Sequence, residues 1–204
     1  MNIFKIMLLL ILLTNSASAE TIQAQTNPPI VDEKLTTEDK NIDQVGSNNS
    51  ETAQEHIKRG GDYASRGEFD RALEEENKAI AIDPNNADAY FYRASVYVVQ
   101  KDFERSFADL NKVIELNPNY VDAYINRGNG FAMKGNLVQA ISDFSKAIEI
   151  NPSKGDAYIN RARAYAFNKQ YDQSWEDIHK AESLGGNINP QFLEGLRRAS
   201  GRQN

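Results

Sequence analysis

The sequence of 204 residues contains no cysteine, only two histidines and no excess of positive charge. Without cysteine the chain forms neither a disulfide framework nor a lipid anchor on an amino-terminal cysteine. A formal net charge of −6 argues against a nucleic-acid partner, which would require a basic face. The histidines, His56 and His179, are far apart in the sequence, so we expect no metal site, no catalytic histidine and no cofactor.

Long hydrophobic runs are also missing. The stretch Ile6–Leu13 has eight apolar residues, too few for a helix that must cross roughly 30 Å of hydrocarbon. It lies between Lys5 and an Ala-Ser-Ala sequence at residues 17–19, an arrangement typical of a secretory signal peptide. We therefore expect residues 1–19 to direct export and to be cleaved before Glu20, with an uncleaved anchor as the alternative. The mature protein would have no integral membrane span and would be periplasmic in a bacterium, or secreted otherwise.

Residues 20–50 are polar and irregular. They include Pro28-Pro29 and the segment Gly46–Ser50, and they carry no sustained apolar period. Such a segment cannot bury enough apolar surface to offset the entropy of ordering it. This composition predicts a disordered linker.

What the sequence does have is a repeat of 34 residues. This interval separates three prolines, Pro84, Pro118 and Pro152, and also three tyrosines, Tyr90, Tyr124 and Tyr158. Self-similarity at such a period indicates stacked supersecondary units, since one unit cannot bury its apolar face alone.

Within each copy, apolar residues recur at helical spacing in two runs. In the copy at residues 121–154, Gly135-Asn136 separates the runs and Asn151-Pro152 ends the second. The unit is therefore predicted to be helix, turn, helix. Helices are expected near residues 51–66, 69–82, 87–100, 103–116, 121–134, 137–150, 155–168 and 171–184.

A further helix is expected after these repeats. Gly185-Gly186 ends the preceding helix, and Asn189 as N-cap with Pro190 at the first position opens the next. Its apolar residues Phe192, Leu193 and Leu196 share one face, opposite Arg197, Arg198 and Arg202. We expect residues 189–204 to form a capping helix and basic tail, because the terminal unit of a stack needs a polar outer side.

The pattern resembles the tetratricopeptide repeat family. The copy at 121–154 matches that family's conserved positions with Tyr124, Gly128, Phe131, Ala140, Phe144, Ala147 and Pro152. The first copy departs from the pattern with His56 at position 4 and Glu76 at position 24, and the last has Gly186 in place of proline. The resemblance implies an all-α fold of four helix-turn-helix repeats, about 53–86, 87–120, 121–154 and 155–188 within residues 51–188, stacked as a right-handed α-solenoid.

Two charged positions recur together in all four copies. Position 7, usually leucine in the family, is arginine, and position 23 is acidic. An arginine near a core is costly without a bidentate carboxylate, so we predict a structural ion-pair ladder between the first and second helices. Its members are Arg59 with Glu75, Arg93 with Asp109, Arg127 with Asp143, and Arg161 with Asp177.

An aspartate also recurs at position 2 of the last three copies, as Asp88, Asp122 and Asp156. Each is expected at the start of a helix, where a carboxylate can cap free amides and suits the positive end of the dipole. We interpret these residues as helix caps rather than as a cation site.

The resemblance implies that the first helices line a concave groove. The candidate groove residues combine apolar side chains with amides and one arginine, which suits an extended peptide. They are Phe91, Tyr92, Ser95, Ile125, Asn126, Asn129, Met133, Ile159, Asn160, Arg163 and Phe167. The carboxylate clamp of chaperone-binding relatives is not expected, because Phe91, Ile125 and Ile159 stand where it has lysine.

These observations predict an exported protein-interaction module that binds a peptide or an extended segment of another protein and catalyses nothing. The first alternative is a self-associating scaffold of the cell envelope that uses the ends of the stack, with a homo-oligomer as its form. The second alternative, an enzyme, has little support because no nucleophile, base and orienting residue converge.

Overall fold

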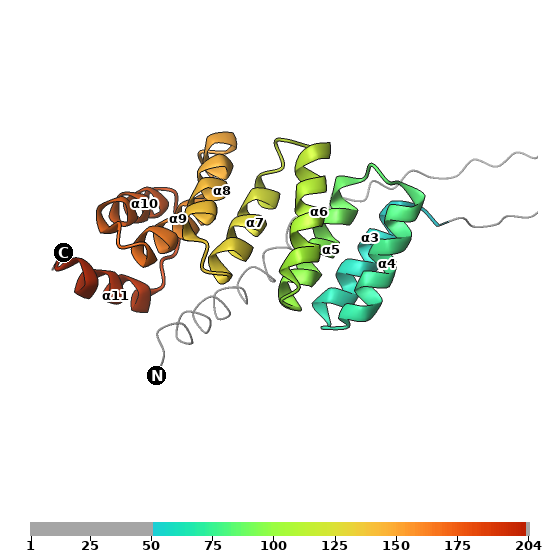
Figure 1. The fold of residues 1–204 in the computed structure, drawn as a ribbon, viewed down its shortest axis with the longest axis horizontal. Coiled ribbons are helices and arrows are strands. Elements are labelled where there is room, and N and C mark those ends of the chain that lie inside the picture. Colours follow the sequence, from blue (N-terminus) through green and yellow to red (C-terminus); the bar gives the residue numbers. More distant parts are fainter. Residues whose placement is uncertain (1–50, 203–204) are drawn as a thin grey trace, which may run out of the picture. The chain divides into compact units, whose positions relative to one another are not determined.

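The computed structural model describes residues 51–202 (Figure 1). Within this range the chain is all-α. Its helices are α3 (Ala53–Ser65), α4 (Phe69–Ile82), α5 (Ala87–Val99), α6 (Phe103–Leu116), α7 (Val121–Met133), α8 (Leu137–Ile150), α9 (Gly155–Phe167), α10 (Tyr171–Ser183) and α11 (Pro190–Ser200). The eight repeat helices begin and end within two residues of the expected positions. The predicted signal peptide and linker lie outside the described residues.

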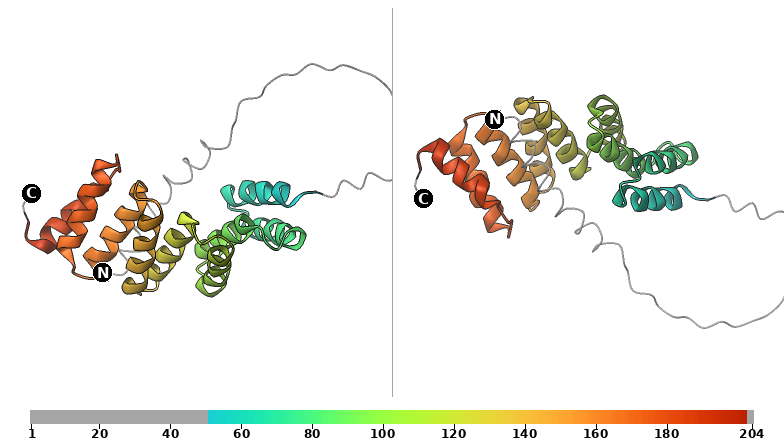
Figure 2. Two further views of the ribbon diagram at one scale, coloured as in Figure 1. Left: turned by 90° about the horizontal axis from the view of Figure 1, so that it is seen from above. Right: turned by 90° about the horizontal axis from the view of Figure 1, so that it is seen from below.

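The helices form two layers within the repeats. Each second helix (α4, α6, α8) packs between the first helix of its own repeat and the first helix of the next. The first helices (α3, α5, α7, α9) also contact one another, more extensively than successive second helices do. Because the stack is tighter on this side, the first helices form the inner side of the repeats, and Figures 1 and 2 show the helix pairs following one another. The fold is that of a tetratricopeptide solenoid.

The turn inside each repeat uses a left-handed residue. Gly67 and Gly135 have φ of 75° and 82°, but Lys101 and Lys169 occupy the equivalent positions with φ of 62° and 60°. A left-handed conformation costs a residue with a side chain roughly 1 kcal/mol. The second and fourth repeats therefore turn with some strain that the first and third avoid.

The recurrent tyrosines and prolines act as pairs. The hydroxyl of Tyr124 donates a hydrogen bond of 3.2 Å to the carbonyl oxygen of Pro118, and Tyr90 and Tyr158 do the same to Pro84 and Pro152. Each bond ties the first helix of a repeat to the loop that precedes it. This explains why an aromatic residue with a hydroxyl recurs at position 4.

Glycine at position 8 allows the two helices of a repeat to approach. A Cβ atom on Gly128 would lie 2.7 Å from the ring of Phe144, which is fully buried. The glycine is therefore required by packing, as its place in the middle of α7 predicts. Phe144 packs in a core cluster with Tyr124, Ala140 and Ala147.

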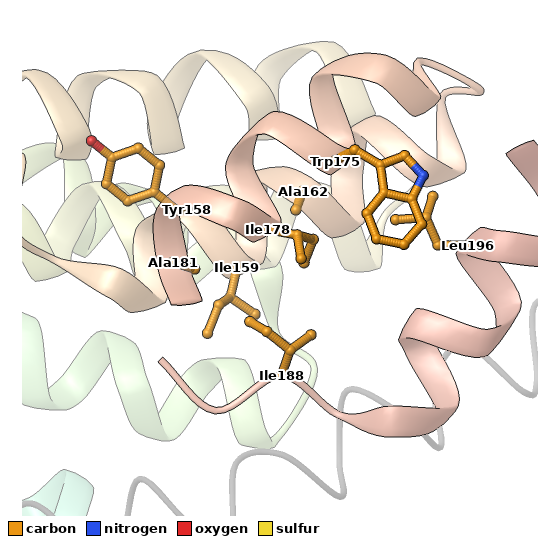
Figure 3. Close-up of a cluster of buried hydrophobic side chains, with 8 residues drawn as sticks. All are labelled: Tyr158, Ile159, Ala162, Trp175, Ile178, Ala181, Ile188 and Leu196. Atoms are coloured by element: carbon orange, nitrogen blue, oxygen red, sulfur yellow. The ribbon is translucent and has the colours of Figure 1, made fainter. Parts of the chain in front are cut away.

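Helix α11 closes the carboxyl-terminal end of the stack. The Asn189 side chain accepts hydrogen bonds from the amides of Gln191 and Phe192, as expected of an N-cap. Figure 3 shows Leu196 beside Trp175, whose Nε1 donates to the hydroxyl of Ser200 at 3.2 Å. The predicted capping helix is thus present. None of the described helices has the length and apolar character needed to cross a membrane.

Candidate functional site

The arginines at position 7 all meet the acidic residue at position 23 of the same repeat. Each arginine of the last three repeats donates two hydrogen bonds, from Nε and Nη2, to the two oxygens of one aspartate. The distances are 2.8 and 2.7 Å for Arg93 with Asp109, and 2.8 Å for both bonds of Arg127 with Asp143 and of Arg161 with Asp177. The hydrogen bonds to these buried aspartates raise the pKa of each guanidinium, and burial opposes the shift.

A third hydrogen bond from each arginine reaches the preceding repeat. The acceptors are the side-chain oxygens of Asn77, Asn111 and Ser145, for Arg93, Arg127 and Arg161 respectively, at 2.6 to 3.0 Å. Sequence reasoning missed these acceptors, although their spacing of 34 residues was a visible signal. The ladder thus joins the helices within a repeat and also joins neighbouring repeats.

The first repeat has a different version of this arrangement. Arg59 Nε donates to Glu75 at 2.8 Å, and His56 Nδ1 lies 2.9 Å from the same oxygen. Lys78 reaches the other oxygen at 2.9 Å. Burial raises the pKa of Glu75, but hydrogen bonds from His56, Lys78 and Arg59 outweigh it and bring that pKa to about 2.

The aspartates at position 2 do not cap their helices, so the capping interpretation was wrong, although each lies in the first turn as expected. The side chain of Asn86 caps α5, and Asp88 instead accepts a hydrogen bond of 2.7 Å from the hydroxyl of Tyr120. Asp122 forms an ion pair of 2.9 Å with Lys154, and no side chain caps α7. Each of these carboxylates lies two residues after the N-cap position, at the second residue of its helix. Asp156 also lies in the first turn of its helix, α9, where its charge suits the dipole.

Two of the predicted groove residues are not on an open surface. Ile125 and Ile159 are each 7% exposed and belong to core clusters. Ile125 packs with Ala157 and Ala164 of the next repeat. Ile159 points toward Ile188 of the closing segment (Figure 3). In the third and fourth repeats, position 5 therefore packs against the unit that follows and contributes nothing to a ligand surface.

The amino-terminal part of the predicted groove is largely engaged in contacts within the chain. The ring of Phe91 lies 5.0 Å from that of Tyr120 and 5.6 Å from that of Tyr92. Ser95 donates to the carbonyl of Phe91 and accepts a 3.1 Å hydrogen bond from Asn126 Nδ2. Burial raises the pKa of Tyr92, and the nearby carboxylates of Asp88, Glu76 and Asp122 add to this.

The middle of the predicted groove is more open. Asn129 lies partly exposed on α7, and its side chain makes no hydrogen bond within residues 51–202. Each of α5, α7 and α9 ends in an apolar residue. Val99 is 57% exposed, Phe167 is 38% exposed, and Met133 is partly exposed. An amide beside exposed apolar side chains can bind both the backbone and the side chains of an extended segment.

Arg163 lies at the carboxyl-terminal end of the predicted groove. Its guanidinium lies 5.9 Å from the ring centre of Phe192 of α11, and Nη1 donates a long hydrogen bond of 3.4 Å to Asn160. It forms no ion pair with any residue that the structure describes, and burial lowers its pKa while Asp156 acts in the opposite direction. A desolvated cation without a carboxylate favours an anionic group from elsewhere.

The apolar side chains of α11 at the stack end pack on the core of the last repeat. Leu196 is buried against Trp175, and Phe192 and Leu193 pack on the same cluster. In the described part of the chain, no group of histidine and acidic residues is arranged to hold a metal ion.

Comparisons with known proteins agree with this fold. Four tetratricopeptide repeat models match residues 60–101, 87–120, 121–154 and 144–176, which together extend from residue 60 to residue 176. The chain belongs to the tetratricopeptide repeat family. No curated protein sequence matches it.

Several solved structures are similar. One crystal structure of MamA is 26% identical with a TM-score of 0.61, over 65% of this chain and 78% of that one. A second has 26% identity and a TM-score of 0.59, over 65% and 72%. The first tetratricopeptide domain of Spaghetti (RPAP3), bound to an HSP90 peptide, is 27% identical with a TM-score of 0.55, over 56% of this chain and 91% of that one. Such arrays are protein-interaction modules that are typically not catalytic.

Proposed function

We propose that the protein binds an extended segment of another protein along the first helices α5, α7 and α9, and catalyses no reaction. The observations that carry this proposal are the partly exposed amide of Asn129, which has no hydrogen-bond partner within residues 51–202, and the exposed apolar side chains at the ends of α5 and α9. In water such apolar exposure is unfavourable, and a partner that covers it gains free energy in proportion to the area buried. The peptide bound to a similar domain supports this mode of binding.

The asparagine side chains of the predicted groove allow the proposed binding to be tested. A partner recovered by crosslinking should be titrated against Asn129→Ala and Asn160→Ala, with Gln139→Ala on the second helix α8 as a matched control. An unpaired backbone group in a dry groove costs roughly 1 to 3 kcal/mol, so each groove variant should bind about ten-fold more weakly. Unchanged affinity of both groove variants would remove this site.

Arg163 would bind a carboxylate if the partner carries one at the carboxyl-terminal end of the predicted groove. Arg163→Ala should then weaken binding more than either asparagine variant, and the difference should shrink in high salt. The same loss at every salt concentration would instead mean that Arg163 acts by supporting Phe192. The self-association alternative predicts that groove variants leave partner capture intact, whereas Phe192→Ala or Leu196→Ala abolishes it.

We further propose that the protein is exported and loses residues 1–19. Lys5, the apolar run Ile6–Leu13 and the Ala-Ser-Ala sequence motivate this proposal. Amino-terminal sequencing of protein purified from its own cells should begin at Glu20. A product that retains the first residues and sediments with membranes would support an uncleaved anchor, and a full-length protein in the cytoplasm would contradict export.

A further inference from the structure

The first repeat has a carboxyl group where the other repeats have a core hydrophobic residue. Position 24 is occupied by Leu110, Phe144 and Ile178 in the second to fourth repeats, and each of these is fully buried. In the first repeat the same position is Glu76, which is 1% exposed. Burying a carboxylate without partners is far more costly than burying the corresponding neutral acid.

The surroundings of Glu76 provide little compensation for a charge. A Cβ atom on Gly60 would lie 2.2 Å from Glu76 Oε1, so the carboxyl packs directly on the backbone of α3. Oε2 is fully buried and has no hydrogen-bond partner within the described residues. Helices α3, α4 and α5 also supply the adjoining apolar cluster, which includes Ile57, Ala79 and Ala89.

The charged and titratable groups around Glu76 are engaged elsewhere. On α3, His56 and Arg59 interact with Glu75, and on α4 that neighbouring carboxylate is itself held by Lys78. On α5, Arg93 is bonded to Asp109 and Asn77. Burial raises the pKa of Glu76 to about 8, although the positive charge of Arg93 opposes the shift and the negative charge of Glu75 adds to it. Burial raises the pKa of Tyr92 on α5, and the charge of Glu76 adds to that shift.

We propose that Glu76 is a pH-sensitive latch for the first repeat. When its carboxyl is protonated, α3 packs on α4; when it ionises, the buried charge favours a state in which α3 separates from α4 and water reaches the carboxylate. The rest of the stack has an apolar side chain at this position and stays closed.

The sign of the pH dependence follows from the raised pKa. In the open state Glu76 has its ordinary pKa of 4.5, and in the closed state it binds its proton up to a pH of about 8. Between these values the closed state holds one more proton than the open state. The equilibrium constant for opening therefore increases about ten-fold for each unit by which the pH rises. Below pH 4.5 this dependence disappears. Glu75, with its lowered pKa, loses stabilisation only below its ordinary pKa of 4.5, so the two pH windows do not overlap.

Opening would change the surface at the amino-terminal end of the stack. It would expose the faces of α4 and α5 that now pack on Ala53 and Ile57 of α3, including the side of Tyr92 that contacts this cluster. The latch is independent of the proposed groove function, because its test measures opening of the first repeat rather than binding.

Hydrogen exchange at amide resolution tests the latch directly. In the wild type, protection of α3 should fall about ten-fold for each unit of rise in pH between pH 5.5 and 7.5, after correction for intrinsic exchange. Helices α7 and α8 serve as an internal reference and should show no such dependence. Glu76→Gln keeps the shape of the side chain and Glu76→Leu restores the residue type of the second repeat. Both should remove the pH dependence.

Glu74→Gln is the matched control, because Glu74 is an exposed glutamate on the same helix that pairs with Lys78. It should leave the slope as in the wild type. Carbon-13 titration of the Glu76 carboxyl gives a second readout that needs no variant. An equal pH dependence in Glu76→Gln and wild type, or a Glu76 carboxyl that titrates near 4.5 in the closed protein, would overturn the proposal.

Discussion

The first repeat and the three repeats after it share helix positions but differ in their interiors. In the later repeats a tyrosine at position 4 bonds to a proline carbonyl, an arginine meets an aspartate with two hydrogen bonds, and position 24 is apolar. In the first repeat these places are taken by His56, by Glu75 with several donors, and by Glu76. The same backbone thus encloses one buried acidic residue beside an apolar one in the later repeats, and two adjacent buried acidic residues in the first.

This difference shows that the fold tolerates polar replacements at the end of the stack. The later repeats have a neighbour on both sides, or a neighbour and α11, whereas the first repeat packs on one side only in the described chain. In a linear stack the stability of each unit depends on its own interior and on its interfaces with its neighbours. The first repeat should therefore open at a lower free energy than the third.

The largest effect should come from breaking the ladder in the middle of the stack. Arg127→Ala leaves Asp143 buried without its partner and should cost about 3 to 5 kcal/mol of unfolding free energy. Arg59→Ala in the first repeat should cost clearly less, because His56 and Lys78 still contact Glu75. Urea denaturation of both variants measures this difference.

Arg105→Ala is the control for that experiment. Arg105 pairs with Asp102 on the surface, and its loss should change stability little. Equal losses for Arg59→Ala and Arg127→Ala would contradict the contrast between the two regions.

A smaller effect is expected from adding one methyl group at a helix crossing. Gly128→Ala drives a Cβ atom to 2.7 Å from Phe144 and should destabilise the protein by about 1 to 3 kcal/mol through overpacking. Gly61→Ala, in the first repeat, meets no atom within 4 Å and should stabilise α3 by about 0.5 to 1 kcal/mol. Thermal unfolding of the two variants should move in opposite directions, and a loss in both would show that the first repeat is as tightly packed as the third.

The smallest effect should come from the bond between repeats. Asn111→Ala removes the acceptor for Arg127 Nη1 at 2.7 Å on an exposed part of the ladder. The expected cost is about 0.5 to 1 kcal/mol, since the guanidinium keeps both bonds to Asp143. A double-mutant cycle with Arg127→Ala isolates this term, and a coupling near zero would show that the ladder does not join the repeats.

The fold could be predicted because periodic residues carry it. The 34-residue spacing of tyrosines and prolines predicts the helix pairs, and the small residue at position 8 has one local role, which is the room that Gly128 leaves for Phe144. Partners outside the family pattern were missed. Asn77 and Asn111 recur as clearly as the arginines that donate to them, but a single polar residue on a helix gives no sign of its hydrogen-bond donor.

The candidate groove was harder to predict because exposure depends on the neighbouring unit. Ile125 and Asn126 are adjacent on one helix, yet the first is buried by the next repeat and the second stays partly open. Arg163 looked like an open cation from its position, whereas α11 places Phe192 beside it. The burial of Ile125 and that of Arg163 do not follow from the repeat pattern, because each depends on the angle at which the next element packs.

Site-directed photo-crosslinking in the native cells tests the central claim of a binding groove most directly. A benzophenone side chain is introduced at Met133 or Phe167 on the proposed groove, and at Val138, which is 68% exposed on the second helix α8, as the matched control. The account predicts crosslinks to an extended segment of a second protein from the two groove positions, abolished by Asn129→Ala, and none from Val138. Crosslinks that form from Val138 or from the outer face of α11, with none from Met133 and Phe167, would contradict it.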